Sequence, residues 1–409
     1  MSEWKKVKFL DLFSEPTKNG IYKSKEFHGR GAKIINMGEV FAYSFIGNQE
    51  MSRVEINDKE RNSFLVKNGD LLFARRSLVE SGAGKCAIAN GITEETTFES
   101  SIIRVRLNEN NAIPLFYMYW MRSLSGRTAI NGIVNGVNVK GIRATDLQNI
   151  EVELPPMETQ HRIATILSRY DSLIENYQKQ IKLLEEAAQR LYKEWFVNLH
   201  FPGHENTKIV DGVPDGWEKK PALDFFEMSI GKTPPRAQKQ WFTKGSNGIP
   251  WVSISDMKDT MFVQETAEEL TQDACENYNI KVVPKGTILL SFKLTVGRVA
   301  FAGADVCTNE AIAHFQKEGD EWKAYTLMYL RNYNYDSLGN TSGISKAVNS
   351  TIIKNMPFVM PCTAILQEFS QRVLPFIKQT ENLQSQIRLL TEARDRLLPK
   401  LMSGEIKVS

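Results

Sequence analysis

The sequence predicts an α+β protein in which two strand-rich globular modules alternate with two long helices. Two observations support this fold class. Seventeen residues, ENYQKQIKLLEEAAQRL at Glu175–Leu191, return 206 positions later as ENLQSQIRLLTEARDRL at Glu381–Leu397, and eleven of the positions are identical. Short β-branched and aromatic runs bounded by Gly, Asn or Asp precede each copy. A repeat of this length indicates two copies of one unit.

Length and composition are those of a globular protein with several domains. The 409 residues can form two to four domains, and 42% are apolar and 24% charged. The formal net charge of +3 is too small to indicate a nucleic-acid partner by itself. The sequence has no signal-peptide pattern and no apolar run of membrane-spanning length, so we expect a cytoplasmic location without membrane contact. Scattered cysteines without CxxC spacing suggest reduced thiols, namely Cys86, Cys275, Cys307 and Cys362.

The first module is expected to occupy residues 1–154. Pro114–Arg122 should form a helix with Pro at its first position, and the Gly- and Asn-rich segment Asn131–Lys140 should form a loop. Pro155 and Pro156 should end the last strand. The expected strands are Ala32–Met37, Asn62–Val66, Asp70–Ala74, Ser101–Leu107 and Ile150–Leu154.

A long helix is then expected from about Glu158 to Val197, roughly 60 Å at 1.5 Å per residue. Its apolar residues recur at alternating spacings of four and three, which is the heptad pattern of a helix that packs against a partner helix. The second copy has the same seam, with polar interruptions at Thr380 and Arg394. An ordinary core helix is the alternative, although core helices rarely run so long without a breaker. The predicted packing residues are Tyr170, Ile174, Tyr177, Ile181, Leu184 and Leu191 in the first copy and Leu383, Ile387, Leu390 and Leu397 in the second.

A turn-rich connector, His200–Gly216, leads to the second module, and the chain divides into residues 1–154, 155–200, 201–361 and 362–409. His200 and His204 have the spacing of helical metal ligands, but the intervening Pro-Gly forbids a regular helix, so no metal site is expected. Gly286–Ser291 matches Gly69–Ala74 at an offset of 217. Because the modules differ far more than the helices, we expect them to bind two different targets at a fixed separation.

The sequence lacks the common catalytic motifs. Gly84-Lys85 is not part of a phosphate-binding loop, because position 79 is Val and position 86 is Cys. We find no G-x-S-x-G, H-E-x-x-H or G-x-G-x-x-G pattern and no Asn/Asp-Pro-Pro-aromatic motif of amino-group DNA methyltransferases. The sequence therefore does not predict an enzyme.

Basic residues instead recur at matched places in both modules, after a central strand and near a Gly-rich loop. Cations on a loop at a strand end can reach DNA phosphates or the edge of guanine, and Gly there allows the backbone to approach a ligand closely. A solvated surface charge is the alternative for each cation, whereas Trp251 and Ile254 are expected to pack. The candidate DNA-binding residues are Arg75, Arg76, Lys85, Lys140, Arg143, Lys293, Arg298 and Lys346.

Several stretches of the chain are distinctive in combination, namely LPPMETQHRIATIL at Leu154–Leu167, LYKEWFVNLHFPG at Leu191–Gly203, VPDGW at Val213–Trp217, GKTPPR at Gly231–Arg236, IPWVSISDM at Ile249–Met257 and LLPKLMSGEI at Leu397–Ile406. Through them the chain resembles the specificity (S) subunit of type I restriction-modification enzymes over nearly its whole length. It departs at Thr159-Gln160, where that family usually has Glu-Gln, and at the sequence Pro361–Ala364, which bears on the start of the second helix.

The resemblance implies that each module is a target-recognition domain that reads one half of a split sequence in double-stranded DNA. It implies an internal pseudo-two-fold repeat in which the long helices form an antiparallel intramolecular coiled coil, set the spacer between half-sites and dock two modification subunits. Those partners would bind S-adenosylmethionine and methylate adenine, and two restriction subunits would use ATP and Mg²⁺. None of these cofactors is expected on this chain. The alternatives are a coiled-coil scaffold that tethers two protein-binding modules and a fused DNA methyltransferase.

Overall fold

The computed structural model describes residues 4–245, 248–338 and 348–408. The chain divides into two compact units, unit 1 with Met1–Ile174 and Leu390–Ser409, and unit 2 with Glu175–Leu389. Two long helices, α6 (Met157–Tyr192) and α10 (Thr363–Met402), contribute residues to both units. Among the described residues, no helix combines the length and apolarity needed to cross a membrane.

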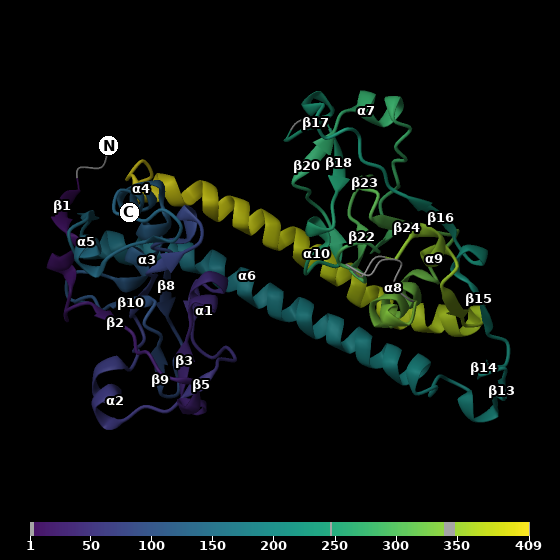
Figure 1. The fold of residues 1–409 in the computed structure, drawn as a ribbon, viewed down its shortest axis with the longest axis horizontal. Helices are drawn as coiled ribbons and strands as arrows, with labels where there is room; N and C mark the ends of the chain where they lie inside the picture. The colour runs from purple at the N-terminus through teal and green to yellow at the C-terminus, as the bar shows by residue number, and fades with distance from the viewer. Residues whose placement is uncertain (1–3, 246–247, 339–347, 409) are drawn as a thin grey trace. The chain divides into compact units, whose positions relative to one another are not determined.

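Unit 1 is strand-rich and carries short helices (Figure 1). Its helices besides α6 and α10 are α1 (Met37–Ala42), α2 (Asp58–Phe64), α3 (Pro114–Arg122), α4 (Leu124–Asn131) and α5 (Ala144–Gln148). Its strands are β1 (Lys5–Lys8), β2 (Lys18–Asn19), β3 (His28–Ile35), β4 (Phe45–Ile46), β5 (Arg53–Val54), β6 (Leu71–Ala74), β7 (Arg76–Ser77), β8 (Cys86–Ala89), β9 (Thr96–Phe98), β10 (Ile102–Val105), β11 (Lys140–Gly141) and β12 (Glu151–Leu154).

Unit 2 repeats this composition. Its helices are α7 (Gln272–Asn277), α8 (Lys323–Asn332) and α9 (Ser350–Lys354), together with parts of α6 and α10. Its strands are β13 (Ile209–Val210), β14 (Val213–Pro214), β15 (Glu218–Pro221), β16 (Glu227–Ile230), β17 (Phe242–Thr243), β18 (Ile249–Val252), β19 (Phe262–Val263), β20 (Glu268–Leu270), β21 (Ile288–Ser291), β22 (Val299–Ala302), β23 (Cys307–Thr308), β24 (Ile312–Gln316) and β25 (Pro357–Met360).

The two units share one sheet topology, so the predicted repeat and the α+β class are confirmed. The five-stranded sheets have the orders β2-β10-β6-β8-β4 and β16-β24-β21-β22-β19, and in each the last pair is parallel while the others are antiparallel. A second sheet contains β5-β3-β9 in unit 1 and β20-β18-β23 in unit 2, again with one antiparallel and one parallel pair. The central strands β6 and β21 lie 217 positions apart, which is the predicted offset.

One predicted strand is wrong. Residues 62–64 of the expected strand Asn62–Val66 belong to α2. The reason is a capping box at the start of this helix. The side chain of Asn57 accepts a hydrogen bond from the Glu60 amide, and the Glu60 carboxylate accepts one from the Asn57 amide. Local capping therefore outweighs the short apolar run that suggested a strand.

Helix α3 lies at the centre of the main core of unit 1. Its residues from Phe116 to Met121 are all buried, although the segment contains several polar aromatic side chains. Those polar groups have partners: the Tyr117 hydroxyl donates to the carbonyl of Glu153, and the Trp120 indole donates to the Glu153 carboxylate. The interactions join α3 to strand β12, so the helix is both buried and hydrogen-bonded.

Helices α6 and α10 meet within unit 1. The carboxylate of Asp171 on α6 accepts a hydrogen bond from Tyr119 and pairs with the guanidinium of Arg394 on α10. Both members of this ion pair are almost fully buried. Leu401 and Met402, near the end of α10, belong to the same core as the first turns of α6. The C-terminal helix is therefore part of the core of the first module.

The same two helices also meet within unit 2, but through apolar residues. Helix α6 continues into a π-helical turn, Lys193–Val197, where the predicted helix also ends. The ring of Trp195 lies 5.7 Å from that of Phe369 on α10, and the ring of Phe196 lies 4.8 Å from it. Ala188 and Ile377, the repeat counterparts of Arg394 and Asp171, are buried in this core. The same two repeat positions, one on each helix, are therefore charged in unit 1 and apolar in unit 2.

The predicted packing residues are all at least half-buried. Ile174 and Leu383 are buried. The others lie at intermediate depth, and they are Tyr170, Tyr177, Ile181, Leu184, Leu191, Ile387, Leu390 and Leu397. Such burial on helices otherwise rich in charged residues agrees with a packed face. Direct contact between the two seams stays a prediction.

A buried histidine links the two sheets of unit 2. His314 on β24 is fully buried, its Nδ1 lies 2.8 Å from the Ser229 hydroxyl, and its Nε2 lies 2.8 Å from that of Thr308. Burial, and to a lesser extent the nearby charge of Lys281, lowers the pKa of His314 to about 4. The ring is therefore neutral at pH 7 and is satisfied by two hydroxyls.

This depressed pKa predicts acid sensitivity. Between pH 6.5 and 4 the unfolded chain binds a proton at His314 that the folded chain does not, so stability falls as the pH falls through this window. His314→Gln, whose amide can serve both hydroxyls, should reduce that loss by up to about 3 kcal/mol. Urea unfolding from pH 7 to pH 4 measures the difference. If the free energy of unfolding fell equally with pH in both proteins, the lowered pKa of His314 would be contradicted.

Candidate nucleic-acid interface

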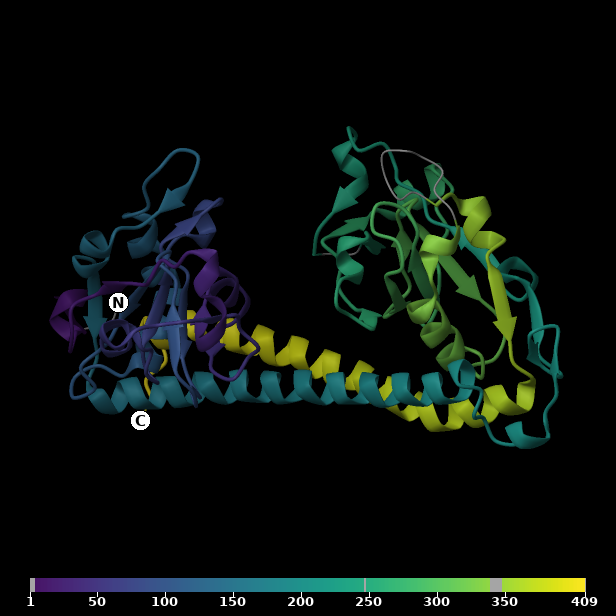
Figure 2. The same ribbon diagram turned by 60° about the horizontal axis from the view of Figure 1, so that its bottom comes forward.

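In unit 1, a short ladder collects four of the predicted DNA-binding cations. Strand β7 pairs with β11, so that Ser77 lies opposite Lys140 and Arg76 opposite Gly141. Arg75 precedes this ladder, and Arg143, which is exposed, follows it. The Gly- and Asn-rich loop before β11 projects from unit 1 beside β7 (Figure 2). Two segments more than sixty residues apart in sequence thus form one basic edge.

The glycine of this ladder serves internal packing. A Cβ atom on Gly141 would lie 2.8 Å from the carbonyl oxygen of Arg75, and that carbonyl accepts a hydrogen bond from the Ile142 amide at 3.0 Å. The glycines for which the sequence suggested close approach to a ligand belong to the preceding loop, Asn131–Lys140, whereas at Gly141 the close neighbour is the chain's own backbone. The 75–85 loop is fixed further by Arg127, which donates to the carbonyls of Ser81 and Ala83. Sequence reasoning missed Arg127, because nothing local links it to that loop.

Lys85 is turned towards its own module. Its ammonium donates to the carbonyl of Phe41 at 2.6 Å, in the last turn of α1. Burial, and then the charge of Arg122, lowers the pKa of the Lys85 ammonium. The structure therefore gives Lys85 a capping role at a helix C-terminus. Its contact with DNA stays a prediction.

In unit 2, the loop after β21 carries the corresponding cations. Lys293 is half-buried, and its ammonium lies 5.6 Å from the Phe292 ring. Arg298 donates to the carbonyl of Ile254 at 2.7 Å, so its guanidinium is already engaged. Lys346 lies outside the described residues. Of the two unit 2 candidates that the structure describes, Lys293 is therefore the cation more available to an external anion.

A cluster that sequence reasoning did not single out lies close to Lys293. The guanidinium of Arg236 lies 4.5 Å from the centre of the Phe242 ring and 4.4 Å from that of the Trp251 ring, and it pairs with Glu268 at 2.6 Å. Trp251 itself is buried, so it packs as expected. Burial would raise the pKa of Glu310, but a hydrogen bond from Thr233 and the charges of Lys293 and Arg236 hold it below its usual value. The GKTPPR stretch, Gly231–Arg236, was the available signal.

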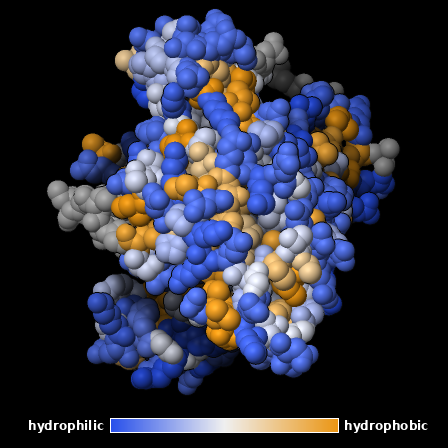
Figure 3. All heavy atoms as spheres, turned by 90° about the vertical axis from the view of Figure 1, so that its right-hand side faces the viewer, coloured by the Kyte–Doolittle hydropathy of each residue, from blue (hydrophilic) through white to orange (hydrophobic). Residues whose placement is uncertain are grey.

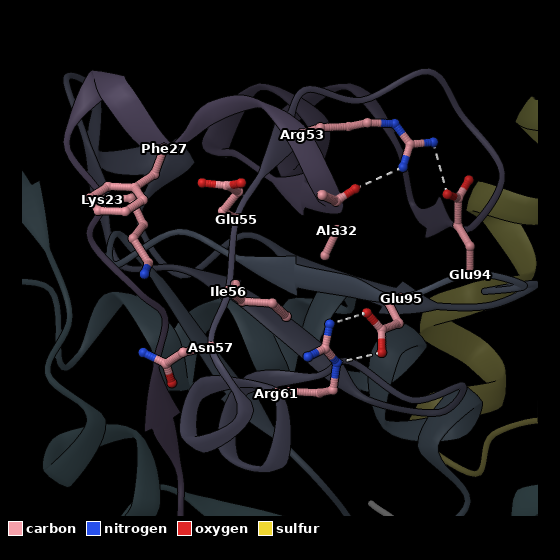
Figure 4. A pocket seen from close by; sticks show the side chains of 11 residues that line it. Lys23, Phe27, Ala32, Arg53, Glu55, Ile56, Asn57, Arg61, Glu94 and Glu95 are labelled. Carbon is pink, nitrogen blue, oxygen red and sulfur yellow. Dashed lines mark hydrogen bonds and ion pairs between the residues drawn. The ribbon is translucent and has the colours of Figure 1, made fainter.

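A cavity of about 620 Å³ in unit 1 is a less suitable anion site (Figure 4). Figure 4 shows Arg61 facing Glu95 and Arg53 facing Glu94, with ion-pair distances of 2.6 and 2.8 Å. Lys23, also at its wall, pairs with Glu60. Because each of these cations has an acidic partner, the cavity offers little net positive charge to a phosphate.

The surface in Figure 3 is mainly hydrophilic, and its hydrophobic residues form small groups separated by polar ones. Both connector histidines bond within the chain: Nδ1 of His200 lies 2.6 Å from the Glu194 carboxylate, and Nδ1 of His204 lies 2.9 Å from the Phe201 carbonyl oxygen. Within the described part of the chain, no group of three or more His, Cys, Asp or Glu residues is placed to hold a metal ion.

Comparison with known proteins identifies the family. The family model described as the type I restriction modification DNA specificity domain matches residues 1–186 and 214–391. The chain belongs to this family. It is a specificity subunit of the type I kind, which is a non-catalytic component. The alternative of a fused DNA methyltransferase is therefore not supported.

Relatives in this specificity family match over nearly their full length. The MjaIX specificity subunit of Methanocaldococcus jannaschii is 27% identical over 94% of this chain and 89% of its own length. The HindI specificity subunit of Haemophilus influenzae is 21% identical over 99% of this chain and 100% of its own. The crystal structure of an S subunit from M. genitalium has the same fold, with a TM-score of 0.62 and 15% identity. The match covers 98% of this chain and 96% of that one.

The basic edge of unit 1 predicts a selective loss of DNA affinity in Arg76→Ala. If Arg76 contacts a phosphate, the slope of log K against log salt should fall by about 0.9. Arg30→Ala is the matched control, because Arg30 is 67% exposed on the same unit and its loss removes the same charge. Fluorescence anisotropy across a salt series measures both variants. Equal effects of the two substitutions would contradict a specific role for this edge.

Proposed function

We propose that this chain is the sequence-specific DNA-binding subunit of a type I restriction-modification complex. Each globular module reads one half of a bipartite target in double-stranded DNA. The paired helices set the spacer between the half-sites and dock two modification subunits. S-adenosylmethionine, ATP and Mg²⁺ belong to the modification and restriction subunits, and two restriction subunits complete the assembly.

One observation carries the proposal. The two modules have the same strand order and pairing directions, yet the loops that follow their central strands differ in length and sequence. In unit 1 the segment between β6 and β8 has eleven residues and contains β7, whereas the corresponding segment between β21 and β22 has seven. A retained scaffold with diverged, cation-bearing loops suits two modules that read different sequences.

The spacer role follows from the helices. Asp171 with Arg394 in unit 1 and Trp195 with Phe369 in unit 2 are contacts between opposite ends of α6 and α10, as an antiparallel pair requires. We propose that the heptad seams pack on each other as an intramolecular coiled coil between these ends. The length of the coiled coil then sets the distance between half-sites, in the way that protein spacing sets half-site spacing in dimeric DNA-binding proteins.

Selection of duplexes from a random library tests the recognition role. The chain in complex with its modification subunit should enrich one sequence composed of two short half-sites at a fixed gap, while the chain alone should bind weakly. Specific complexes are typically about 10³–10⁷-fold tighter than non-specific ones, so the enrichment should be large. Sequence-indifferent binding by the complex would overturn the proposal. Binding of other proteins without DNA would favour the scaffold alternative.

The docking role rests on an exposed helix face that is the same in both repeats. Leu183 and its counterpart Leu389 are 65% and 54% exposed. The ion pair between Glu186 and Arg190 recurs as the pair between Glu392 and Arg396. Both pairs are exposed to solvent. Internal packing does not constrain these positions, so their identity calls for another explanation. Two copies of one partner, each bound to one repeat, supply it.

This face predicts a stepwise change in stoichiometry. Leu183→Glu or Leu389→Glu alone should release one modification subunit, and the double variant should release both, because each change places a charge in one apolar contact. Leu173→Glu is the control, since Leu173 is exposed on α6 but its repeat counterpart is Gln379. Native mass spectrometry of the co-expressed complex counts the subunits. Two partners retained by the double variant would contradict the assignment.

A further inference from the structure

Among the residues that the structure describes, the most exposed aliphatic side chains include one leucine in the loop after each central strand. Leu78 in unit 1 is 84% exposed, and Leu294 in unit 2 is 81% exposed. Leu294 directly follows Lys293, whereas Leu78 follows Arg75 and Arg76 after one intervening residue, Ser77. A single exposed leucine is common on protein surfaces, but one in the cation-bearing loop of each unit indicates a shared role.

In unit 1, Leu78 is accompanied by other apolar residues. Continuing the β7–β11 register by one residue places Leu78 opposite Val139, which is half-exposed. Val137, at the tip of the same projecting loop, is 91% exposed, and Val79 is also exposed. A small aliphatic group therefore stands between the cations of the two segments. The edge of unit 1 around this group is basic. It therefore complements the dense negative charge of a polyanion better than a protein surface with few acidic residues.

In unit 2, Leu294 is held in a strained conformation. Its φ of 60° lies in the left-handed region, which is uncommon for a leucine. The Thr295 amide donates to the carbonyl of Lys293 at 2.7 Å, which closes a three-residue turn around Leu294. Ser291 fixes the turn by donating to the Thr295 carbonyl at 2.6 Å and by accepting from the Arg298 amide at 3.0 Å. The turn therefore presents an apolar side chain at a cost in backbone strain.

We propose that Leu78 and Leu294 contact the bases of the bound duplex, one in each half-site, and act as specificity-determining residues. This inference rests on the proposed DNA-binding function. The adjacent cations hold the phosphates, and the leucine reaches past them to the apolar surfaces that bases offer, namely thymine methyl groups and unstacked base faces. Strain at Leu294 is retained because the position serves binding and not stability.

Three substitutions test the assignment in the complex with the modification subunit, on the duplex that library selection yields. Leu78→Ser and Leu294→Asn should each weaken binding roughly ten-fold or more, since each loses most of a buried leucine side chain. The salt slope should stay unchanged, because no charge is removed. Leu10→Ser in unit 1 is a control for an exposed leucine away from these loops.

The effects should separate by half-site. Leu78→Ser should relax base preference only in the half-site read by unit 1, and Leu294→Asn only in the other. Asn tolerates positive φ, so Leu294→Asn should keep or raise the melting temperature while it lowers affinity. Thymine-to-uracil replacement and 2-aminopurine fluorescence then tell methyl contact from unstacking.

The possible failures are distinct. If wild-type complex shows no sequence preference, the proposed function itself fails. If wild-type complex is specific and the leucine variants keep its affinity and base preference, the inference alone is overturned. An equal loss on cognate and random DNA would also overturn it, because a base contact must favour the cognate sequence.

Discussion

The buried ion pair between Asp171 and Arg394 decides how the first module is assembled. It ties the C-terminal helix α10 to the start of α6, inside a core that also contains α3 through Tyr119. Loss of Arg394 would leave the buried Asp171 carboxylate without its charge partner, at a cost of about 3–5 kcal/mol. The first module therefore depends on the last twenty residues of the chain, Leu390–Ser409, although it is encoded almost entirely by the first 174.

The counterpart positions in unit 2 differ in chemistry from this ion pair. Ala188 and Ile377 are buried there, where unit 1 has Arg394 and Asp171. If the repeat counterparts were exchanged, Asp171 would face Ala188 and Arg394 would face Ile377. Each charge would then lie against an apolar partner. A polar position within an apolar seam, such as Arg394, is a recognised means of selecting register and partner. In this chain it distinguishes two repeats that otherwise share eleven of seventeen residues.

Most of the architecture could be predicted from the sequence because it depends on local patterns. Heptad spacing predicted the long helices, and the offset of 217 predicted that β6 and β21 are equivalent strands. The segment Asn62–Val66 was predicted wrongly because a capping box at Asn57 decides its structure. The site was harder to predict. The β7–β11 ladder joins two-residue strands that have no periodicity, and only tertiary structure shows that Lys85 bonds to Phe41 and Arg298 to Ile254.

We propose that helix length sets the distance between two half-sites that are read independently. Inserting the same four residues after Gln180 in α6 and after Gln386 in α10 adds one turn to both helices, roughly 6 Å. Sequencing of methylated adenines in a host that carries this variant reads the target directly. The variant should direct methylation to the same two half-sites, separated by about one or two additional base pairs. Altered half-sites with an unchanged spacer would contradict it.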